Sequence, residues 1–194
     1  MYQNVHALNE EIARALIKAG ARKPTVSSSS RLPDGRLDRM YSQEFRLKSS
    51  SGLLPSSLLW FTSTHRIQLQ SAFLLMTYQQ LCQSMKRRMN MPPDAIARAA
   101  LTRAITLYQE VAGGKESVDI SADRAAFFLR AFSDAMWLST NGNDALAIKL
   151  SGCSLCRVPL MIPRHHSEYH CTACKPRLRR ASRAKPHDGE KLAA

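Results

Sequence analysis

Four cysteines in two close pairs are the feature that most limits how this chain can fold. Cys153 and Cys156 are separated by two residues, fourteen residues follow, and Cys171 and Cys174 repeat the same spacing. Each pair can direct two sulfurs at one ion from a tight turn, and two pairs complete the tetrahedron that Zn²⁺ accepts. A site closed by four thiolates is structural, and it supplies folding energy to a segment with almost no core of its own. The spacing therefore predicts one Zn²⁺ per chain.

Other uses of the cysteines make different demands on the sequence. An iron–sulfur cluster also takes four cysteines, and the spacing leaves it open. A disulfide framework is typical of secreted proteins, and the N-terminus lacks the basic start and apolar centre of a secretory signal. A redox dithiol is expected beside a βαβ unit, and no such pattern occurs in the sequence. The fifth cysteine, Cys82, is expected to be a small buried apolar residue within a helix.

The segment between the two cysteine pairs contains three histidines, His165, His166 and His170. Because the cysteines already supply four ligands, we expect these imidazoles at the surface or around the site rather than on the metal. Residues 157–163 and 167–171 are expected to form a short hairpin between the two pairs.

The charge of the chain points to a polyanionic partner. Lys and Arg number 28 against 15 Asp and Glu, a net charge of +13, and nucleic acid is the commonest partner of such a chain. Residues 151–194 hold nine of the basic residues against three acidic ones. The stretch after the last cysteine is expected to be a disordered tail that contacts phosphates, because arginine matches phosphate oxygens and releases counterions. Its cations are Lys175, Arg177, Arg179, Arg180, Arg183 and Lys185.

Apolar residues recur at spacings of three and four through most of the first 150 residues, which predicts an all-α body. The expected helices span about 5–19, 36–46, 65–90, 95–111 and 122–140. Segments rich in serine and proline, at 24–35 and 48–57, are expected to be loops. No alternating strand pattern occurs before residue 150. The predicted organisation is a multi-helix body over 1–148, a small zinc module over 149–176 and a basic tail over 177–194.

Several classes of protein are disfavoured by what the sequence lacks. The longest apolar runs are only a few residues, whereas a membrane span needs ~20, so we expect no membrane segment and a cytoplasmic protein. No Walker loop, dinucleotide-binding glycine pattern, GxSxG or HExxH motif occurs. We therefore expect a protein that is not an enzyme.

Several segments, in order along the chain, resemble the bacterial FlhC family of flagellar transcriptional activator subunits. They are IKAGAR at 17–22, GRLDRMYSQE at 35–44, LLPSSLLWFTSTHRIQLQSAF at 53–73, RAITLY at 103–108, and LSG before the CxxC pairs with RLRR after them. The sequence departs from the family pattern at Leu59, Thr64 and Leu69, where the family often has an acidic residue, a tryptophan and a histidine.

The resemblance implies an α-helical DNA-binding subunit that assembles with FlhD, as two FlhC and four FlhD chains. Such complexes bind upstream of flagellar promoters and recruit RNA polymerase, and the four cysteines of the family bind zinc. Helices over 65–140 are then expected to contact the partner. Two other functions stay open from the residues alone, a zinc-containing RNA-binding module and a thiol–disulfide oxidoreductase.

The resemblance also suggests where the body meets DNA. We expect an N-terminal helix-turn-helix over 8–46, formed by the helices near 8–19 and 36–46 with residues 24–35 as the turn. The arginines expected to face DNA from this unit are Arg31, Arg36, Arg39 and Arg46.

Overall fold

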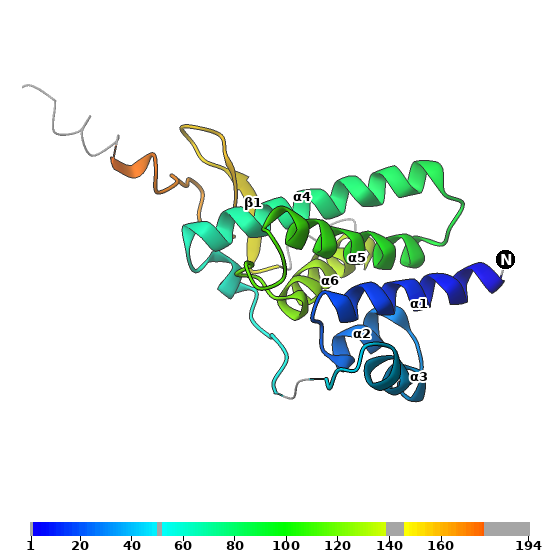
Figure 1. Ribbon diagram of the computed structural model, residues 1–194. Helices are drawn as coiled ribbons and strands as arrows, with labels where there is room; N and C mark the ends of the chain where they lie inside the picture. The colour runs from blue at the N-terminus through cyan, green and yellow to red at the C-terminus, as the bar shows by residue number, and fades with distance from the viewer. Residues whose placement is uncertain (1, 50–51, 139–145, 177–194) are drawn as a thin grey trace, which may run out of the picture.

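The computed structural model describes residues 2–49, 52–138 and 146–176 (Figure 1). Its elements are α1 (Tyr2–Lys18), α2 (Lys23–Ser30), α3 (Asp34–Arg39), a π-helical turn (Met40–Glu44), a 3₁₀ turn (Leu59–Thr62), α4 (His65–Arg88), α5 (Pro93–Val111), α6 (Ala122–Leu138), β1 (Ile148–Gly152) and β2 (Pro159–Pro163). Figure 1 shows α4 and α5 antiparallel, with α1 beside α5 and the short helices α2 and α3 beyond α1. Within the described ranges, none of the helices combines the length and apolar character needed to cross a membrane.

The body is held together by one apolar core between these helices. Leu16 of α1, Tyr78 of α4 and Ile105 of α5 are almost completely buried in it. Phe61 of the 3₁₀ turn packs on Phe128 of α6 with their ring centroids 4.5 Å apart. Burial of one such side chain contributes about 1.5–3 kcal/mol, so these residues are a main source of the body's stability. The predicted all-α class is confirmed, with a two-stranded sheet added at the C-terminal end.

The loop predicted over 24–35 is wrong, because residues 23–30 form helix α2. Pro24 lies in its first turn, where the missing N–H does no harm. Val26 and Ser29 are buried against the rest of the body, and the Ser28 hydroxyl donates to the Thr25 carbonyl at 3.0 Å. The Ser28 side chain thus finds a partner inside the helix, and tertiary packing overrides the weak helix propensity of serine.

The new helix changes the expected helix-turn-helix. The expected turn over 24–35 is largely helix α2, and α2 and α3 are joined by the three residues 31–33. Arg31 ends α2 in the left-handed conformation, with φ of 58°, and this sharp turn sends the chain into α3. A connection of this length occurs in helix-turn-helix motifs, and the motif itself stays a prediction for this chain.

The sheet also differs from the expected hairpin. Strand β1 pairs antiparallel with β2, from Ile148 opposite Pro163 to Gly152 opposite Pro159. The two strands therefore flank the first cysteine pair instead of lying between the two pairs. Residues 167–171, expected as the second strand, are not part of the sheet. The missed strand β1 is five residues long with a buried Ile148, and a pattern this short gives little periodic signal.

A buried ion pair joins the start of α6 to the connection between α1 and α2. Asp123 accepts from the backbone N–H of Arg22 at 3.0 Å, from the Arg22 Nε at 2.6 Å and from the Thr25 hydroxyl. The same guanidinium donates to the carbonyls of Gly52 and Leu53, each at 3.0 Å. Three segments that are distant in sequence are thus fixed by one charge pair that is mostly shielded from water.

Candidate metal centre and basic surfaces

The sulfurs of Cys153, Cys156, Cys171 and Cys174 lie within 4.8 Å of one another. The Cys156 side chain reaches the surface and the other three are buried. The Sγ atoms of Cys156 and Cys171 are 3.7 Å apart, and all four cysteines are free thiols. A single ion at the centre of the group can reach every sulfur. A cluster of several irons would hold its cysteines farther apart, so the geometry favours one ion over an iron–sulfur cluster.

Each cysteine pair is shaped by local backbone hydrogen bonds. In the first, the N–H of Arg157 donates to the Cys153 carbonyl at 2.9 Å, and Arg157 has a left-handed φ of 63°. In the second, the N–H groups of Cys174 and Lys175 both donate to the Cys171 carbonyl at 3.0 Å. Two tight turns therefore bring four sulfurs to one point, as the CxxC spacing predicts.

The electrostatic environment of the four cysteine sulfurs favours a bound cation. The N–H of Cys171 donates to the Cys153 sulfur at 3.3 Å, and this bond, together with one from Cys156, lowers the pKa of the Cys153 thiol to about 5. The hydrogen bond with the Cys171 sulfur raises the pKa of Cys174 to about 12. Successive thiolates so close together repel one another, and a divalent cation removes that repulsion. The residues present therefore fit a metal ion whose binding releases protons.

The module that carries the cysteines is attached to the body along strand β2. Leu160 and Ile162 pack with the buried cysteines, whereas Met161 and Ile148 belong to the core of the body. Leu69 of α4 packs against the same side of the module. The two cores thus share one strand.

A polar contact reinforces this attachment. The Tyr169 hydroxyl donates to Gln68 Oε1 of α4 at 2.9 Å. The Tyr169 carbonyl in turn accepts from the N–H of Ser154 at 2.9 Å, next to the first cysteine pair. Tyr169 therefore links the two ends of the module to the long helix.

The cysteine group of the described residues contains none of the histidines. His165 and His166 are exposed and lie against each other, with ring centroids 4.5 Å apart. His170 Nδ1 is buried without a hydrogen-bond partner among the described residues. Cys82 is buried in the body core, where burial raises the pKa of its thiol, as expected of a small apolar residue.

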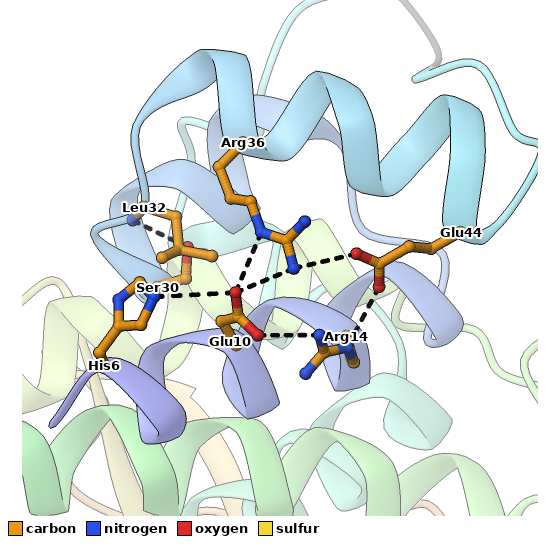
Figure 2. Close-up of polar contacts among 7 residues, drawn as sticks. All are labelled: His6, Glu10, Arg14, Ser30, Leu32, Arg36 and Glu44. Carbon is orange, nitrogen blue, oxygen red and sulfur yellow. Dashed lines mark hydrogen bonds and ion pairs between the residues drawn. The ribbon is translucent and has the colours of Figure 1, made fainter. Parts of the chain in front are cut away.

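Arg36, predicted to face DNA, instead lies in an ion-pair network between α3 and α1 (Figure 2). Its guanidinium contacts Glu10 at 2.9 Å and Glu44 at 3.0 Å. Arg14 contacts the same two carboxylates, at 2.8 and 3.2 Å. The hydrogen bond from Arg14 lowers the pKa of Glu10, and Arg36 adds to this effect. The positive charge of Arg36 is thus balanced by the Glu10 and Glu44 carboxylates, and this network holds α3 on α1.

The other predicted basic residues lie in two separate regions. Arg31, Arg39 and Arg46 are exposed on or just after the α2–α3 unit, and Lys175 is exposed beside the cysteine group. Figure 1 shows these regions on opposite sides of the molecule. Arg31 is paired with Asp94 of α5 at 2.7 Å. The remaining predicted residues lie outside the part of the chain that the structure describes: Arg177, Arg179, Arg180 and Arg183.

With this geometry in place, comparison with known proteins identifies the family. The family model described as "Flagellar transcriptional activator (FlhC)" matches residues 3–187, nearly the whole chain. The chain belongs to the FlhC family. Flagellar transcriptional regulators FlhC from Pectobacterium carotovorum and Burkholderia lata are 25% and 26% identical to it, over 90% and 89% of this chain and 82% and 72% of theirs. The regulator FlhC of Serratia marcescens is 24% identical, over 90% of this chain and 82% of its own.

Membership of the FlhC family confirms the resemblance drawn from the sequence, at an identity that marks a divergent member. It places the chain among transcriptional regulators of flagellar genes, a family of regulators rather than enzymes. The cysteine group is consistent with metal binding in this member.

One basic feature of this FlhC-family chain was missed in the sequence. Lys86, Arg87 and Arg88 are consecutive and exposed in the last turn of α4. Cations there also oppose the negative end of the helix dipole. The signal for this cluster in the sequence is the run of three consecutive basic residues.

Proposed function

We propose that this chain is the DNA-binding subunit of a heteromeric activator of flagellar genes. It acts in the cytoplasm with FlhD, as two copies with four FlhD chains, binds promoter DNA and recruits RNA polymerase. The observation that carries the proposal is the family match over residues 3–187, together with a net charge of +13. A regulator of transcription with this excess of cations is expected to work by contacting DNA phosphates.

The metal in this proposal is one Zn²⁺ per chain, held by Cys153, Cys156, Cys171 and Cys174. Zn–S bonds of about 2.3 Å give a tetrahedron with edges of about 3.8 Å. The 3.7 Å between the Cys156 and Cys171 sulfurs supports this assignment. With four thiolates the ion has no open position, so its part is to hold the module in shape.

The proposed DNA contacts come from the cations that remain available. Arg39 and Arg46 extend from the α2–α3 unit, and Arg31 lies at its turn, although Asp94 shares its charge. Lys175 begins a second contact that continues into the tail. Arg36 is the least suited of the predicted set because two carboxylates already surround its guanidinium.

Replacing both Arg39 and Arg46 with alanine is expected to weaken binding to a flagellar promoter fragment roughly tenfold at moderate salt. The slope of log affinity against log salt should fall by about 2, one for each lost phosphate contact. Gel shifts with the chain and FlhD together, at several salt concentrations, measure both quantities. Arg66→Ala, which removes an exposed arginine paired with Asp119, is the matched control. No binding by the wild-type mixture at low salt would refute the proposed function.

The proposed binding site for FlhD is a groove of about 840 Å³ between α1, α5 and the C-terminal end of α4. Its floor is apolar and rich in methionine, a side chain that adapts to a partner surface. The apolar residues are Leu8, Ile12, Met85, Met89 and Met91. Among its lining residues, Arg14 pairs with Glu10 and Glu44 and Arg103 pairs with Glu110, which leaves Lys18 and Lys115 against Glu11. This balance favours an amphipathic helix of FlhD that carries acidic residues beside its apolar face.

The groove predicts that Met89→Lys weakens assembly with FlhD about tenfold or more, because a charge replaces an apolar contact. Size-exclusion chromatography of the mixed chains across a concentration series measures the association. Leu53→Lys, at a side chain that is 98% exposed, is the control and should assemble as wild type does. Equal assembly of both variants would place the FlhD contact elsewhere.

The alternative of an RNA-binding module gains no support from the described residues. Stacking on single-stranded bases needs a free aromatic face. Tyr169 is the aromatic residue beside the cysteines, and the Lys175 ammonium lies over its ring at 5.2 Å while its hydroxyl bonds to α4. A thiol–disulfide function would need a reactive CxxC, and retention of one zinc per chain would argue against it.

A further inference from the structure

A second charged site lies away from the cysteines, in a cavity of about 190 Å³ between α2, α5 and α6. The end of α2 contributes Ser28 and Ser29, α5 contributes Arg98, and α6 contributes Arg130. A cavity of this size holds a group such as phosphate but not a large organic ligand, for which pockets of about 300–1,000 Å³ are usual.

The charges around the cavity leave an excess of cation. Arg31, Arg98 and Arg130 line it against two carboxylates, Asp94 and Asp134. Asp94 is shared, because one oxygen contacts Arg31 at 2.7 Å and the other contacts Arg98 at 3.1 Å. One carboxylate cannot balance two guanidinium groups, so the wall formed by α2 and α5 remains positive.

Arg130 has a different environment from the other two arginines. Its Nε donates to the Ala126 carbonyl at 3.3 Å, and one Nη donates to the Ser28 hydroxyl. Among the residues that the structure describes, no carboxylate oxygen lies within 4.0 Å of it. Burial lowers the pKa of Arg130, and the more distant Asp134 and Asp123 oppose that effect only in part. A partly buried guanidinium with spare N–H groups and no direct counterion is unfavourable, and an anion would relieve that cost.

A buried hydroxyl beside Arg130 also lacks a partner. Ser29 is 3% exposed, and its Oγ makes no hydrogen bond within the described residues. A buried hydroxyl without a partner costs about 1–3 kcal/mol. The Ser29 carbonyl accepts from Arg98 at 3.3 Å, and the neighbouring Ser28 hydroxyl accepts from Arg130, so the end of α2 contacts both guanidinium groups.

We infer that this cavity binds a phosphate group, with Arg130 as its main cation and the Ser29 hydroxyl as a further donor. Guanidinium and hydroxyl donors converging on one small space match the tetrahedral oxyanion in shape and charge. The phosphate can belong to a free anion or to the backbone of DNA that lies over the end of α2. The site does not depend on the cysteine group, and only its DNA source rests on the proposed function.

The first test uses inorganic phosphate and the full chain. Phosphate is expected to raise the melting temperature of the wild type above that in chloride of equal ionic strength. Arg130→Gln should weaken the apparent phosphate affinity about 100-fold, because a charge-assisted hydrogen bond and the main cation are lost together. Arg66→Gln, which changes an exposed arginine of α4 outside the cavity, should respond as the wild type does.

A second variant keeps the test decisive if Arg130→Gln does not fold. Ser29→Ala removes the hydroxyl that has no partner, so without phosphate this variant should be as stable as the wild type or more stable. Its phosphate affinity should nevertheless fall about tenfold. Unchanged phosphate affinity in Ser29→Ala would remove that hydroxyl from the site and overturn the inference as stated.

A duplex DNA arm separates the two sources of phosphate. If free phosphate stabilises the wild type and Arg130→Gln binds DNA normally, the ligand is a free anion. If free phosphate has no specific effect but Arg130→Gln and Ser29→Ala weaken DNA binding where Arg66→Gln does not, the ligand is a backbone phosphate. The inference is overturned if neither ligand distinguishes the cavity variants from the control. If the wild type binds no DNA, the proposed function is refuted, but the result with free phosphate still stands.

Discussion

Cys171→Ser is expected to abolish metal retention and to destabilise the C-terminal module. Serine cannot supply the thiolate, and the N–H of Cys171 also donates to the Cys153 sulfur, so one substitution removes a ligand and disturbs another. Structural zinc sites contribute roughly 10–16 kcal/mol of apparent binding free energy, which a module with so small a core cannot replace. Leu160 and Ile162, packed on the cysteines, would lose their support.

Metal analysis after dialysis measures the outcome, with about one zinc per chain for the wild type and close to none for Cys171→Ser. Circular dichroism should show that the long helices remain, because most of their contacts lie in the body. Cys82→Ala is the control, since it removes a cysteine of the body core and should keep the metal. Full zinc occupancy in Cys171→Ser would contradict the assignment of the four ligands.

The second large effect is expected from Asp123→Ala in the body. The substitution leaves Arg22 with a charge that is mostly shielded from water and no carboxylate to balance it. It also removes the acceptor for the Arg22 backbone N–H and the Thr25 hydroxyl. Breaking a buried pair by removing one partner costs about 3–5 kcal/mol.

For a chain of this length such a loss lowers the melting temperature by roughly 10 °C, which thermal unfolding at fixed pH and metal content can measure. Asp119→Ala is the matched control. Asp119 pairs with Arg66 at the surface, and an exposed pair contributes at most about 1 kcal/mol. Equal melting temperatures for the two variants would show that the Arg22 guanidinium finds water or another partner when Asp123 is absent.

The long helices and the group of four cysteines could be predicted from sequence because their signals are local. In α4, α5 and α6 the apolar residues repeat at helical spacing over four turns or more, and each CxxC pair sets its own turn. Helix α2 was missed because its eight residues include four serines and have little periodicity. Its stability comes from burial against α1 and α6, which no local pattern reveals. Strand β1 was missed for the same reason.

The predicted DNA-contacting arginines show a second limit of sequence reasoning. An arginine on a predicted helix can face solvent or a carboxylate on another helix, and the two cases look alike in sequence. Arg36 belongs to the second, because Glu10, 26 positions earlier, lies opposite it on α1. The cavity around Arg130 is similar, since its walls come from three helices that are distant in sequence.

Strand β2 has a consequence for how the molecule responds to its surroundings. Met161 faces the core of the body, while its neighbours Leu160 and Ile162 face the cysteines. This five-residue strand therefore forms part of both the body core and the cysteine cluster. A fragment ending before β1 would open the body core to water, and the isolated C-terminal segment would expose the other side of the same strand. Loss of a metal from the cysteines would therefore loosen a strand that also lines the body core, so that edge of the core would weaken while the long helices remain.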